Sequence, residues 1–380
     1  MKKISITVMC TFALAACTTQ PKTPSVESFV FNGNPIVRNN FTADPAPVVI
    51  GDSLYLFVGH DEYYEGQDSA NGGKEFNITE WLCYSTADLK TWYDHGSVLR
   101  PSNFAWADTV SWGVGTAWAS QVVPYNGKYY YFTTCQGQKP YSGYCVGVAV
   151  ADSPSGPYVD AIGKPLICDT MTVNGPRGWW NDIDPTVLVD NGEVWLSWGN
   201  GTCFLAKLKP NLTELADSIR ILKAPKYIEG PWLHKYNGKY YLSYASMSNG
   251  GEGIDYMMAN SMTGEWIHKG EITGAAENSF TIHPGIVEFK GEWYLFYHNA
   301  TLELNGKKGT IGRRSVCFDK MEYNEDGTIK FVTQTKEGLV AVKAGLATNC
   351  SIEKKSKKGK RLFALSIKTI EESLYIDSHR

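Results

Sequence analysis

Three acidic residues and a histidine occur at matching places in a repeated sequence layout. The acids are Asp44, Asp184 and Glu229, and the histidine is His283. In each of these segments a glycine turn follows seven to nine residues later, and an aromatic-rich stretch comes after the turn. Equivalent positions in the repeats of a closed ring lie around one axis. We therefore expect these four side chains to meet in one pocket.

Three carboxyl groups in one pocket suit the hydrolysis of a glycosidic bond. One carboxylic acid must protonate the leaving oxygen, while a second carboxylate activates water or attacks the anomeric carbon. The two need different pKa values at one pH, and a third carboxylate nearby raises the pKa of the acid by like-charge repulsion. Asp44 or Asp184 alone would be interpreted as the start of an Asp-Pro turn. The matching positions of all three acids carry the hypothesis.

His283 and the adjacent pair Arg313 and Arg314 could complete this pocket. On the axis, His283 could ligate a metal ion or hydrogen-bond a carboxylate across the channel. Calcium prefers oxygen ligands, so water would have to supply most of its coordination shell. Strand alternation sends one of the two arginines inward and the other outward. The inward arginine would bind sugar hydroxyls or balance the acids, and the outward one would lie on the surface.

The elements that must position these residues are predicted to be strands. Asn-Gly between β-rich runs is the strongest short-range signal for a hairpin. Turns of this kind recur 46 to 76 residues apart, at Gly51, Gly127, Gly192, Gly238 and Gly291. A second turn before an aromatic residue recurs in residues 85–92, 152–158 and 260–266 and predicts outer hairpins. The layout predicts an all-β, five-bladed β-propeller with a central channel, in preference to a β-sandwich.

Composition narrows the function. The chain of 380 residues is long enough for one large β domain or two small ones. Its net charge of −3 gives no indication of nucleic acid binding. Aromatic residues make up 13% of the chain, which suits strands and core packing as well as stacking against sugars. Because no C-x-x-C pair occurs, a zinc site or thioredoxin-type motif is not indicated.

The N-terminus predicts export. Lys2 and Lys3 precede an apolar run that ends in Leu14-Ala15-Ala16-Cys17. Residues 1–16 are therefore interpreted as a secretory signal that ends in a bacterial lipobox, and the run is too short for a permanent transmembrane helix. An acylated Cys17 would anchor the protein in the bacterial cell envelope, with residues 17–33 as a tether. The alternative is plain secretion. In a bacterial protein, sequons such as Asn200-Gly201-Thr202 carry little meaning.

The repeat pattern ends near residue 333. Beyond it, residues 354–361 form a basic run without interleaved aromatic residues. We expect residues 333–380 to be a solvated or disordered tail. The propeller domain is accordingly assigned to residues 34–332.

Several motifs together resemble glycoside hydrolase family 43, and in particular its arabinoxylan arabinofuranohydrolases. The resemblance extends from about residue 34 to residue 332. The motifs are residues 42–46, 59–62, 81–83, 117–121, 182–186, 229–232, 280–285 and 313–317. Members of this family are five-bladed β-propellers, so the resemblance implies the same fold.

The resemblance also implies roles for individual residues. It implies an inverting mechanism in which Asp44 is the base, Glu229 is the acid and Asp184 tunes the pKa of the acid. It implies further that His283 lies at a central calcium or water site and that Arg313 contacts the sugar.

Other residues in the matching motifs are expected to bind substrate. They are His60, Asp61 and Trp118. The substrate implied is a polysaccharide or oligosaccharide of the arabinoxylan or xylan type.

Three activities remain open at this stage. The first is an α-L-arabinofuranosidase that removes side chains from arabinoxylan. The second is a β-xylosidase or endo-1,4-β-xylanase on the same propeller, because L-arabinofuranose and D-xylopyranose present similar hydroxyl geometry. The third is a surface glycan-binding protein with an inactive site. The intact set of three acids argues against this third reading, since a pure binder need not keep all of them.

Overall fold

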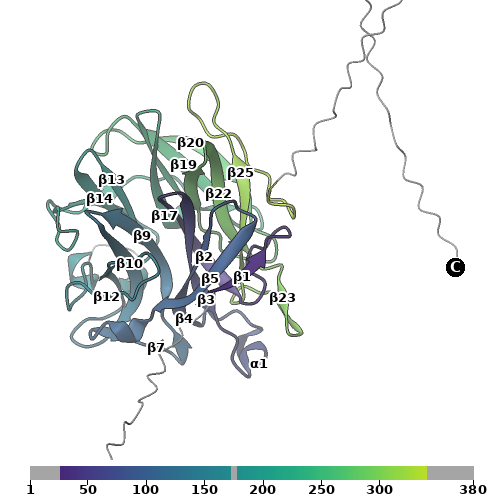
Figure 1. Cartoon of the computed structure of the whole chain (residues 1–380). Coiled ribbons are helices and arrows are strands. Elements are labelled where there is room, and N and C mark those ends of the chain that lie inside the picture. The colour runs from purple at the N-terminus through teal and green to yellow at the C-terminus, as the bar shows by residue number, and fades with distance from the viewer. Residues whose placement is uncertain (1–25, 173–177, 340–380) are drawn as a thin grey trace, which may run out of the picture.

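The computed structural model describes residues 26–172 and 178–339. Within these residues the regular structure is almost entirely β, and the strands form five larger sheets arranged around a centre (Figure 1). The predicted five-bladed propeller is confirmed. The expected signal peptide, Cys17 and the chain beyond residue 339 lie outside the described residues.

Each blade is an antiparallel sheet built mainly from consecutive strands. Blade 1 contains β1 (Glu27–Val30), β2 (Thr42–Ile50), β3 (Ser53–Asp61), β4 (Ile78–Thr86) and β5 (Thr91–Leu99). Blade 2 contains β6 (Ala107–Asp108), β9 (Trp118–Tyr125), β10 (Lys128–Gly137), β11 (Tyr144–Ala151) and β12 (Val159–Asp160). Blade 3 contains β13 (Thr186–Asp190), β14 (Glu193–Trp198), β15 (Cys203–Leu208) and β16 (Arg220–Leu222).

The remaining blades follow the same order. Blade 4 contains β17 (Tyr227–Tyr236), β18 (Lys239–Ser248), β19 (Gly251–Ala259) and β20 (Ile267–Thr273). Blade 5 contains β21 (Gly285–Phe289), β22 (Glu292–Asn299) and β25 (Ser315–Met321). Two small hairpins are β7 (Val110–Ser111) with β8 (Val114–Gly115), and β23 (Glu303–Leu304) with β24 (Lys307–Lys308). The short helices are α1 (Gln67–Asn71), η1 (Pro101–Asn103), η2 (Asp169–Met171) and η3 (Gly178–Trp180).

The first strands of the blades line the centre. Strands β2, β9, β13, β17 and β21 contact one another in a closed ring. All five predicted glycine turns connect these strands to the second strand of their blade, and each turn glycine has a positive φ between 59° and 81°. The three predicted outer turns connect β4 to β5, β11 to β12, and β19 to β20.

Apolar side chains from neighbouring blades pack together and form the core. Leu205 of blade 3 lies in one cluster with Leu233 and Met257 of blade 4. Sheets that are covered on both faces need strands that are apolar on both faces, and β19 is buried along its whole length. This packing holds each first strand in place against the channel.

The two ends of the described chain pack on the propeller. Strand β1 pairs with β5, and residues 34–42 run beside β25, where the backbone N–H of Ile36 donates to the Val316 carbonyl at 2.8 Å. Near the other end, the Gln334 side-chain amide donates to the Gly274 carbonyl at 2.9 Å. Residues 27–30, which were expected to belong to the tether, therefore form β1, and residues 333–339 pack on the propeller. None of the described helices has the length and apolar character needed to cross a membrane.

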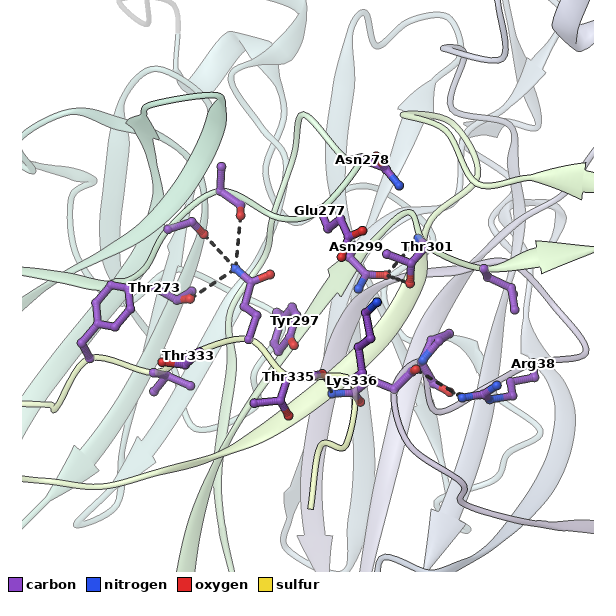
Figure 2. A pocket seen from close by; sticks show the side chains of 18 of the residues that line it. Arg38, Thr273, Glu277, Asn278, Tyr297, Asn299, Thr301, Thr333, Thr335 and Lys336 are labelled. Atoms are coloured by element: carbon purple, nitrogen blue, oxygen red, sulfur yellow. Dashed lines mark hydrogen bonds between the residues drawn. The ribbon is translucent and has the colours of Figure 1, made fainter. Parts of the chain in front are cut away.

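A cavity of about 740 Å³ lies where these two end segments pass blades 4 and 5 (Figure 2). Its lining is mainly polar and includes Arg38, Asn278 and Lys336. It shares no lining residue with the pocket that Asp44, Asp184 and His283 line. It is therefore separate from the predicted site.

Candidate active site

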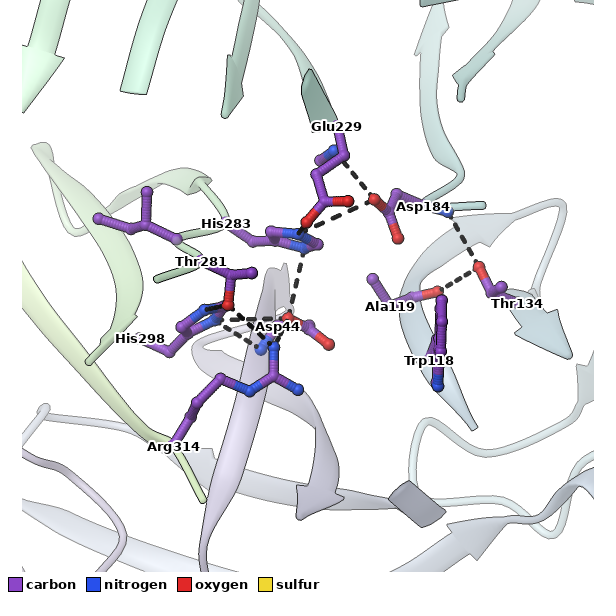
Figure 3. A network of polar contacts seen from close by, with 12 residues as sticks. Asp44, Trp118, Ala119, Thr134, Asp184, Glu229, Thr281, His283, His298 and Arg314 are labelled. Carbon is purple, nitrogen blue, oxygen red and sulfur yellow. Dashed lines mark hydrogen bonds and ion pairs between the residues drawn. The ribbon is translucent and has the colours of Figure 1, made fainter. Parts of the chain in front are cut away.

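The three acids and His283 meet at the centre of the ring, as their matching sequence positions predict (Figure 3). Asp44 and Glu229 lie near the beginning of the first strands β2 and β17, and Asp184 and His283 lie two residues before β13 and β21. Asp44, Asp184 and His283 are buried, and the Glu229 side chain is 14% exposed. One residue from each of four blades thus contributes to a single cluster.

The backbone turns sharply at these positions. Asp44 and Asp184 have positive φ values of 54° and 59°, which are uncommon for residues other than glycine. In blade 4 the corresponding turn falls on Gly230, with φ 57°. A Cβ atom at Gly230 would lie 2.9 Å from the nearest atom of the His283 ring, so glycine also provides room for the imidazole.

Pairing irregularities accompany these turns. The register between β2 and β3 shifts between Ala43 and Ala46, on either side of Asp44. The register between β17 and β18 shifts on both sides of Glu229. Because a β-bulge re-aims a side chain, these shifts allow Asp44 and Glu229 to point into the channel although their strands continue down its wall.

His283 links the three carboxyl groups. Its Nδ1 atom lies 3.3 Å from Asp44 Oδ1, and its Nε2 atom lies 3.3 Å from Glu229 Oε1 and 3.8 Å from Asp184 Oδ2. Burial alone would lower the pKa of His283, but the negative charges of the three carboxylates outweigh it and raise the pKa to about 10. His283 is therefore a protonated cation at neutral pH.

Asp184 is as buried as Asp44. Burial, together with the charges of Glu229 and Asp44, raises the pKa of Asp184 to about 8, against the opposing effect of His283. Its Oδ2 atom accepts a hydrogen bond of 3.0 Å from the Gly230 N–H. The cluster therefore retains a proton at neutral pH, and Asp184 is the carboxyl group that favours holding it.

Arg314 supplies the second positive charge. Its Nε and Nη2 atoms donate to both carboxylate oxygens of Asp61 at 2.9 Å, and its Nη1 atom donates to Asp44 Oδ1 at 3.1 Å. The Asp61 side chain is fully buried. Asp61 therefore orients Arg314 and has no surface that a sugar could contact, so its predicted role in substrate binding is corrected.

Arg313 points away from the acids. Its guanidinium donates to Gln67 Oε1 at 2.8 Å, to Asp68 Oδ1 at 2.7 Å and to the Lys308 carbonyl at 2.9 Å. The expected sugar contact from Arg313 is therefore wrong, and Arg314 is the arginine at the site. The Arg314 backbone N–H donates to Asp61 at 2.8 Å, which fixes Arg314 toward the acids. Arg313 faces away from them, but it is buried and does not lie on the surface as expected.

His60 has no contact with the acid cluster in the described part of the chain. Its Nδ1 atom lies 3.0 Å from Glu80 Oε1, and this hydrogen bond helps to lower the pKa of Glu80 to about 2. Alternation along β3 turns His60 away from the side on which Asp61 lies. Its role in substrate binding stays a prediction.

Trp118 lies at the edge of the cluster (Figure 3). Its ring stacks on Tyr144 at a centroid distance of 4.0 Å and lies 5.0 Å from the ring of Trp180. The Trp118 side chain is partly exposed. Such a fixed, partly exposed ring suits stacking against a sugar, and this role also stays a prediction.

His298 is a site residue that the sequence did not reveal. Its Nδ1 atom accepts the Asp44 backbone N–H at 3.2 Å, and its Nε2 atom lies 3.0 Å from Thr281 Oγ1. Burial, Arg314 and His283 lower the pKa of His298 well below its ordinary value, so the ring is neutral. It holds the strained backbone of Asp44. It lies on the second strand of its blade, where the repeat gives no signal.

Asn200 was also missed as a site residue. Its Nδ2 atom donates to Glu229 Oε2 at 2.6 Å, and its side chain is buried. It lies in the turn between β14 and β15. The only sequence signal there was a sequon, which has no bearing on this contact.

The side-chain atoms around His283 show how well this place would suit the predicted calcium ion. Asp184, Glu229 and His283 offer ligand atoms within 4.8 Å of one another. Calcium prefers six to eight oxygens, whereas this group supplies one nitrogen and two carboxyl groups, and both ring nitrogens of the protonated His283 face carboxylates. These residues suit hydrogen bonding across the channel better than direct coordination of calcium. Calcium at His283 stays a prediction, which chelation followed by calcium addition would test.

Known proteins resemble this chain over the same region. The model of the family described as "Glycosyl hydrolases family 43" matches residues 32–329. The chain is 29% identical over 361 residues to an arabinoxylan arabinofuranohydrolase of Bacillus subtilis (strain 168), covering 84% of this chain and 67% of the relative. It is 30% identical over 340 residues to an arabinoxylan arabinofuranohydrolase of Paenibacillus polymyxa, covering 81% of this chain but only 52% of the relative.

Solved structures agree with these sequence matches. An α-L-arabinofuranosidase from Clostridium thermocellum ATCC 27405 superposes with a TM-score of 0.62 at 34% identity. The match covers 79% of this chain and 96% of that enzyme. The similarity therefore extends over nearly the whole of that enzyme and over the propeller described here.

Proposed function

This chain belongs to glycosyl hydrolase family 43 and is a glycoside hydrolase, and from that premise we propose that it removes α-L-arabinofuranosyl side chains from arabinoxylan with inversion of configuration. The observation that carries the proposal is the cluster of three carboxyl groups around His283. It provides a base, an acid and a third carboxyl group in one pocket.

The positions of Asp44 and Glu229 support inversion. They contact opposite nitrogens of the same imidazole ring, each at 3.3 Å. The imidazole ring and its two contacts therefore lie between the carboxyl groups of Asp44 and Glu229. Such a separation suits an inverting enzyme, in which the two carboxyl groups are roughly 6.5–9.5 Å apart and leave room for water. It suits a retaining enzyme less well, because there the spacing is about 5–5.5 Å.

The proposed reaction is a single displacement. Asp44, held by Arg314 and His283, accepts a proton from water while the water oxygen attacks the anomeric carbon. The bond from that carbon to the leaving oxygen breaks, and Glu229 gives its proton to the leaving oxygen. Asp184 does not react; its burial and its charge influence the protonation of the cluster.

The choice of arabinose draws support from the relatives. Both arabinoxylan arabinofuranohydrolases and the superposed α-L-arabinofuranosidase are named for arabinose release. Incubation with arabinoxylan followed by chromatography of the released sugars tests this choice, and arabinose is the expected product. Xylose in its place would assign a β-xylosidase, and xylo-oligosaccharides an endo-xylanase. Binding without hydrolysis would indicate a glycan-binding protein.

We also propose that Cys17 carries a lipid that holds the enzyme in the bacterial cell envelope. The lipobox sequence supports this proposal. A wild-type protein expressed in bacteria should partition into the detergent phase of a Triton X-114 extraction, and Cys17→Ser should move it to the aqueous phase. Aqueous partitioning of both proteins would favour plain secretion.

A further inference from the structure

We infer that Asn200 is a positioning residue for Glu229, an inference that rests on the proposed function of Glu229 as the general acid. The Asn200 amide donates to Glu229 Oε2 at 2.6 Å. The other carboxyl oxygen, Oε1, lies 3.3 Å from His283 Nε2. Each oxygen of the proposed acid thus has a defined partner, which fixes the plane of the carboxyl group.

The turn that carries Asn200 is bonded to the residues immediately before Glu229. The Gly201 N–H donates to the Ile228 carbonyl at 2.6 Å, and the Tyr227 hydroxyl donates to the Gly199 carbonyl at 2.7 Å. A turn of blade 3 is therefore attached to the start of β17 in blade 4 by two bonds besides the one from Asn200.

The same turn is also attached beside Asp184. The Gly199 N–H donates to the Ile183 carbonyl at 2.8 Å. Gly199 has φ 127°, and a Cβ atom there would lie 2.0 Å from the Thr202 carbonyl oxygen, so this tight turn requires glycine. The turn therefore fixes Asn200 relative to two of the three acids.

A neutral donor suits a group that changes its charge during the reaction. His283 already lies on Oε1; a second cation, on Oε2, would further favour the ionised form before the proton is transferred, and an anion there would oppose ionisation. An amide N–H does neither strongly in the ground state, but its hydrogen bond strengthens as the carboxyl group becomes negative. An interaction that strengthens in the transition state lowers the barrier. Asn200 should therefore assist protonation of the leaving group.

The test compares leaving groups. Asn200→Ala should lower kcat on arabinoxylan by roughly 10- to 100-fold, the range expected for loss of one hydrogen bond to a charged group, with little change in KM. On a dinitrophenyl arabinofuranoside, which needs no protonation, kcat should stay within about twofold. Asn200→Asp keeps the shape but cannot donate to the ionised carboxylate, so it should show the same selective loss.

Two controls separate positioning from stability. Thr202→Ala alters the same turn at a hydroxyl group that makes no hydrogen bond in the described part of the chain, and it should leave both activities unchanged. The Asn200→Ala substitution should add little to Glu229→Gln in the double variant, because both remove one step.

Each outcome decides the inference. Equal losses on both substrates, or no loss on arabinoxylan, would overturn it while leaving the role of Glu229 intact. If Glu229→Gln itself shows no dependence on the leaving group, the proposed acid fails and the inference fails with it. Selective loss in both Asn200 variants supports the inference.

Discussion

At the residue scale, the site is a balance of buried charges. The His283 imidazolium and the Arg314 guanidinium lie within 3.3 Å of the same oxygen of Asp44. Buried charges are tolerated when they are paired and hydrogen-bonded. The two cations allow several carboxyl groups to share one pocket, and Asp184 is left as the carboxyl group that keeps a proton near neutral pH.

Replacement of the proposed acid should affect substrates unequally. Glu229→Gln cannot donate a proton to the leaving oxygen, so hydrolysis of arabinoxylan should fall by roughly 100-fold or more. Dinitrophenyl glycosides, whose leaving group needs no proton, should be hydrolysed at nearly the wild-type rate. Steady-state kinetics on both substrates check this, and equal losses would argue against the assignment.

Replacement of Asp184 should change the pH dependence. In the wild-type enzyme, the pKa of Asp184 is raised to about 8, so its ionisation near that pH places a negative charge beside Glu229, and a nearby like charge opposes the ionisation of an acid. Asp184→Asn removes that charge, while its amide oxygen can still accept the Gly230 N–H. The basic limb of the pH–rate profile should move to lower pH and the rate should fall. An unchanged profile would show that Asp184 only shapes its turn.

The sequence predicted some of the residues in the site but not all of them. Asp44, Asp184, Glu229 and His283 were found because the repeat places them equivalently. Asn200 and His298 were not found, because they lie on turns or strands outside the first strand of each blade. Their roles depend on contacts between blades, which a repeat pattern does not encode.

At the element scale, irregular starts of regular strands create the pocket. The glycine turns that end the first strands were predictable from Asn-Gly and similar pairs, since those turns need positive φ. The positive φ of Asp44 and the bulges near the acids were not predictable, because tertiary contacts impose them. Alternation predicted that Arg313 and Arg314 face opposite ways, but only the bond from Arg314 to Asp61 decides which one faces inward.

The acidic partners of Arg314 and Arg313 differ in burial, so replacing each one tests how burial affects stability. Asp61→Ala leaves the buried Arg314 without its main partner and should lower the free energy of unfolding by about 3–5 kcal/mol, with loss of activity. Asp68→Ala removes a partner that is 46% exposed; although Arg313 itself is buried, Gln67 and the Lys308 carbonyl still bond its guanidinium, so the loss should be clearly smaller. Urea unfolding of both variants measures this, and similar stabilities would contradict the assigned role of Asp61.

At the scale of the whole molecule, ring closure connects the site to stability. Five blades followed from five glycine turns, and the closed ring of first strands confirms them. The domain limits were less predictable: β1 and residues 333–339 have no repeat signal, and they are held by pairing and packing with blades distant in sequence. Acids from different blades meet only when the ring is closed. Their mutual repulsion therefore lowers the free energy of unfolding of the whole propeller.

This cost predicts lower stability at alkaline pH. The folded-state pKa values of Asp184, Glu252 and His283 are raised to about 8, 9 and 10 by burial or neighbouring charges. A group with a raised folded pKa contributes stability below its unfolded pKa and loses it as pH rises through the folded pKa. The melting temperature should therefore fall as pH rises from about 4, where the two acids begin to ionise in the unfolded chain, to about 10, where His283 loses its proton in the folded protein.

Replacement of Glu252 tests how much this one residue contributes to the pH dependence of the melting temperature. Burial, followed by the charge of Glu229, raises its pKa from 4.5 to about 9. Glu252→Gln should match the wild type in melting temperature near pH 4, where both are uncharged, and should exceed it above pH 9. Parallel melting curves across this range would show that Glu252 carries no such penalty.

The stereochemistry of the first product tests the central claim most directly. If Asp44 activates water and Glu229 protonates the leaving oxygen, hydrolysis of an α-L-arabinofuranoside must release the β-anomer first. Proton NMR recorded during the first minutes of hydrolysis, before mutarotation, distinguishes the two anomers. Initial β-arabinofuranose is the predicted result. Initial α-arabinofuranose, or a glycosyl ester trapped on Asp44, would contradict the proposed mechanism.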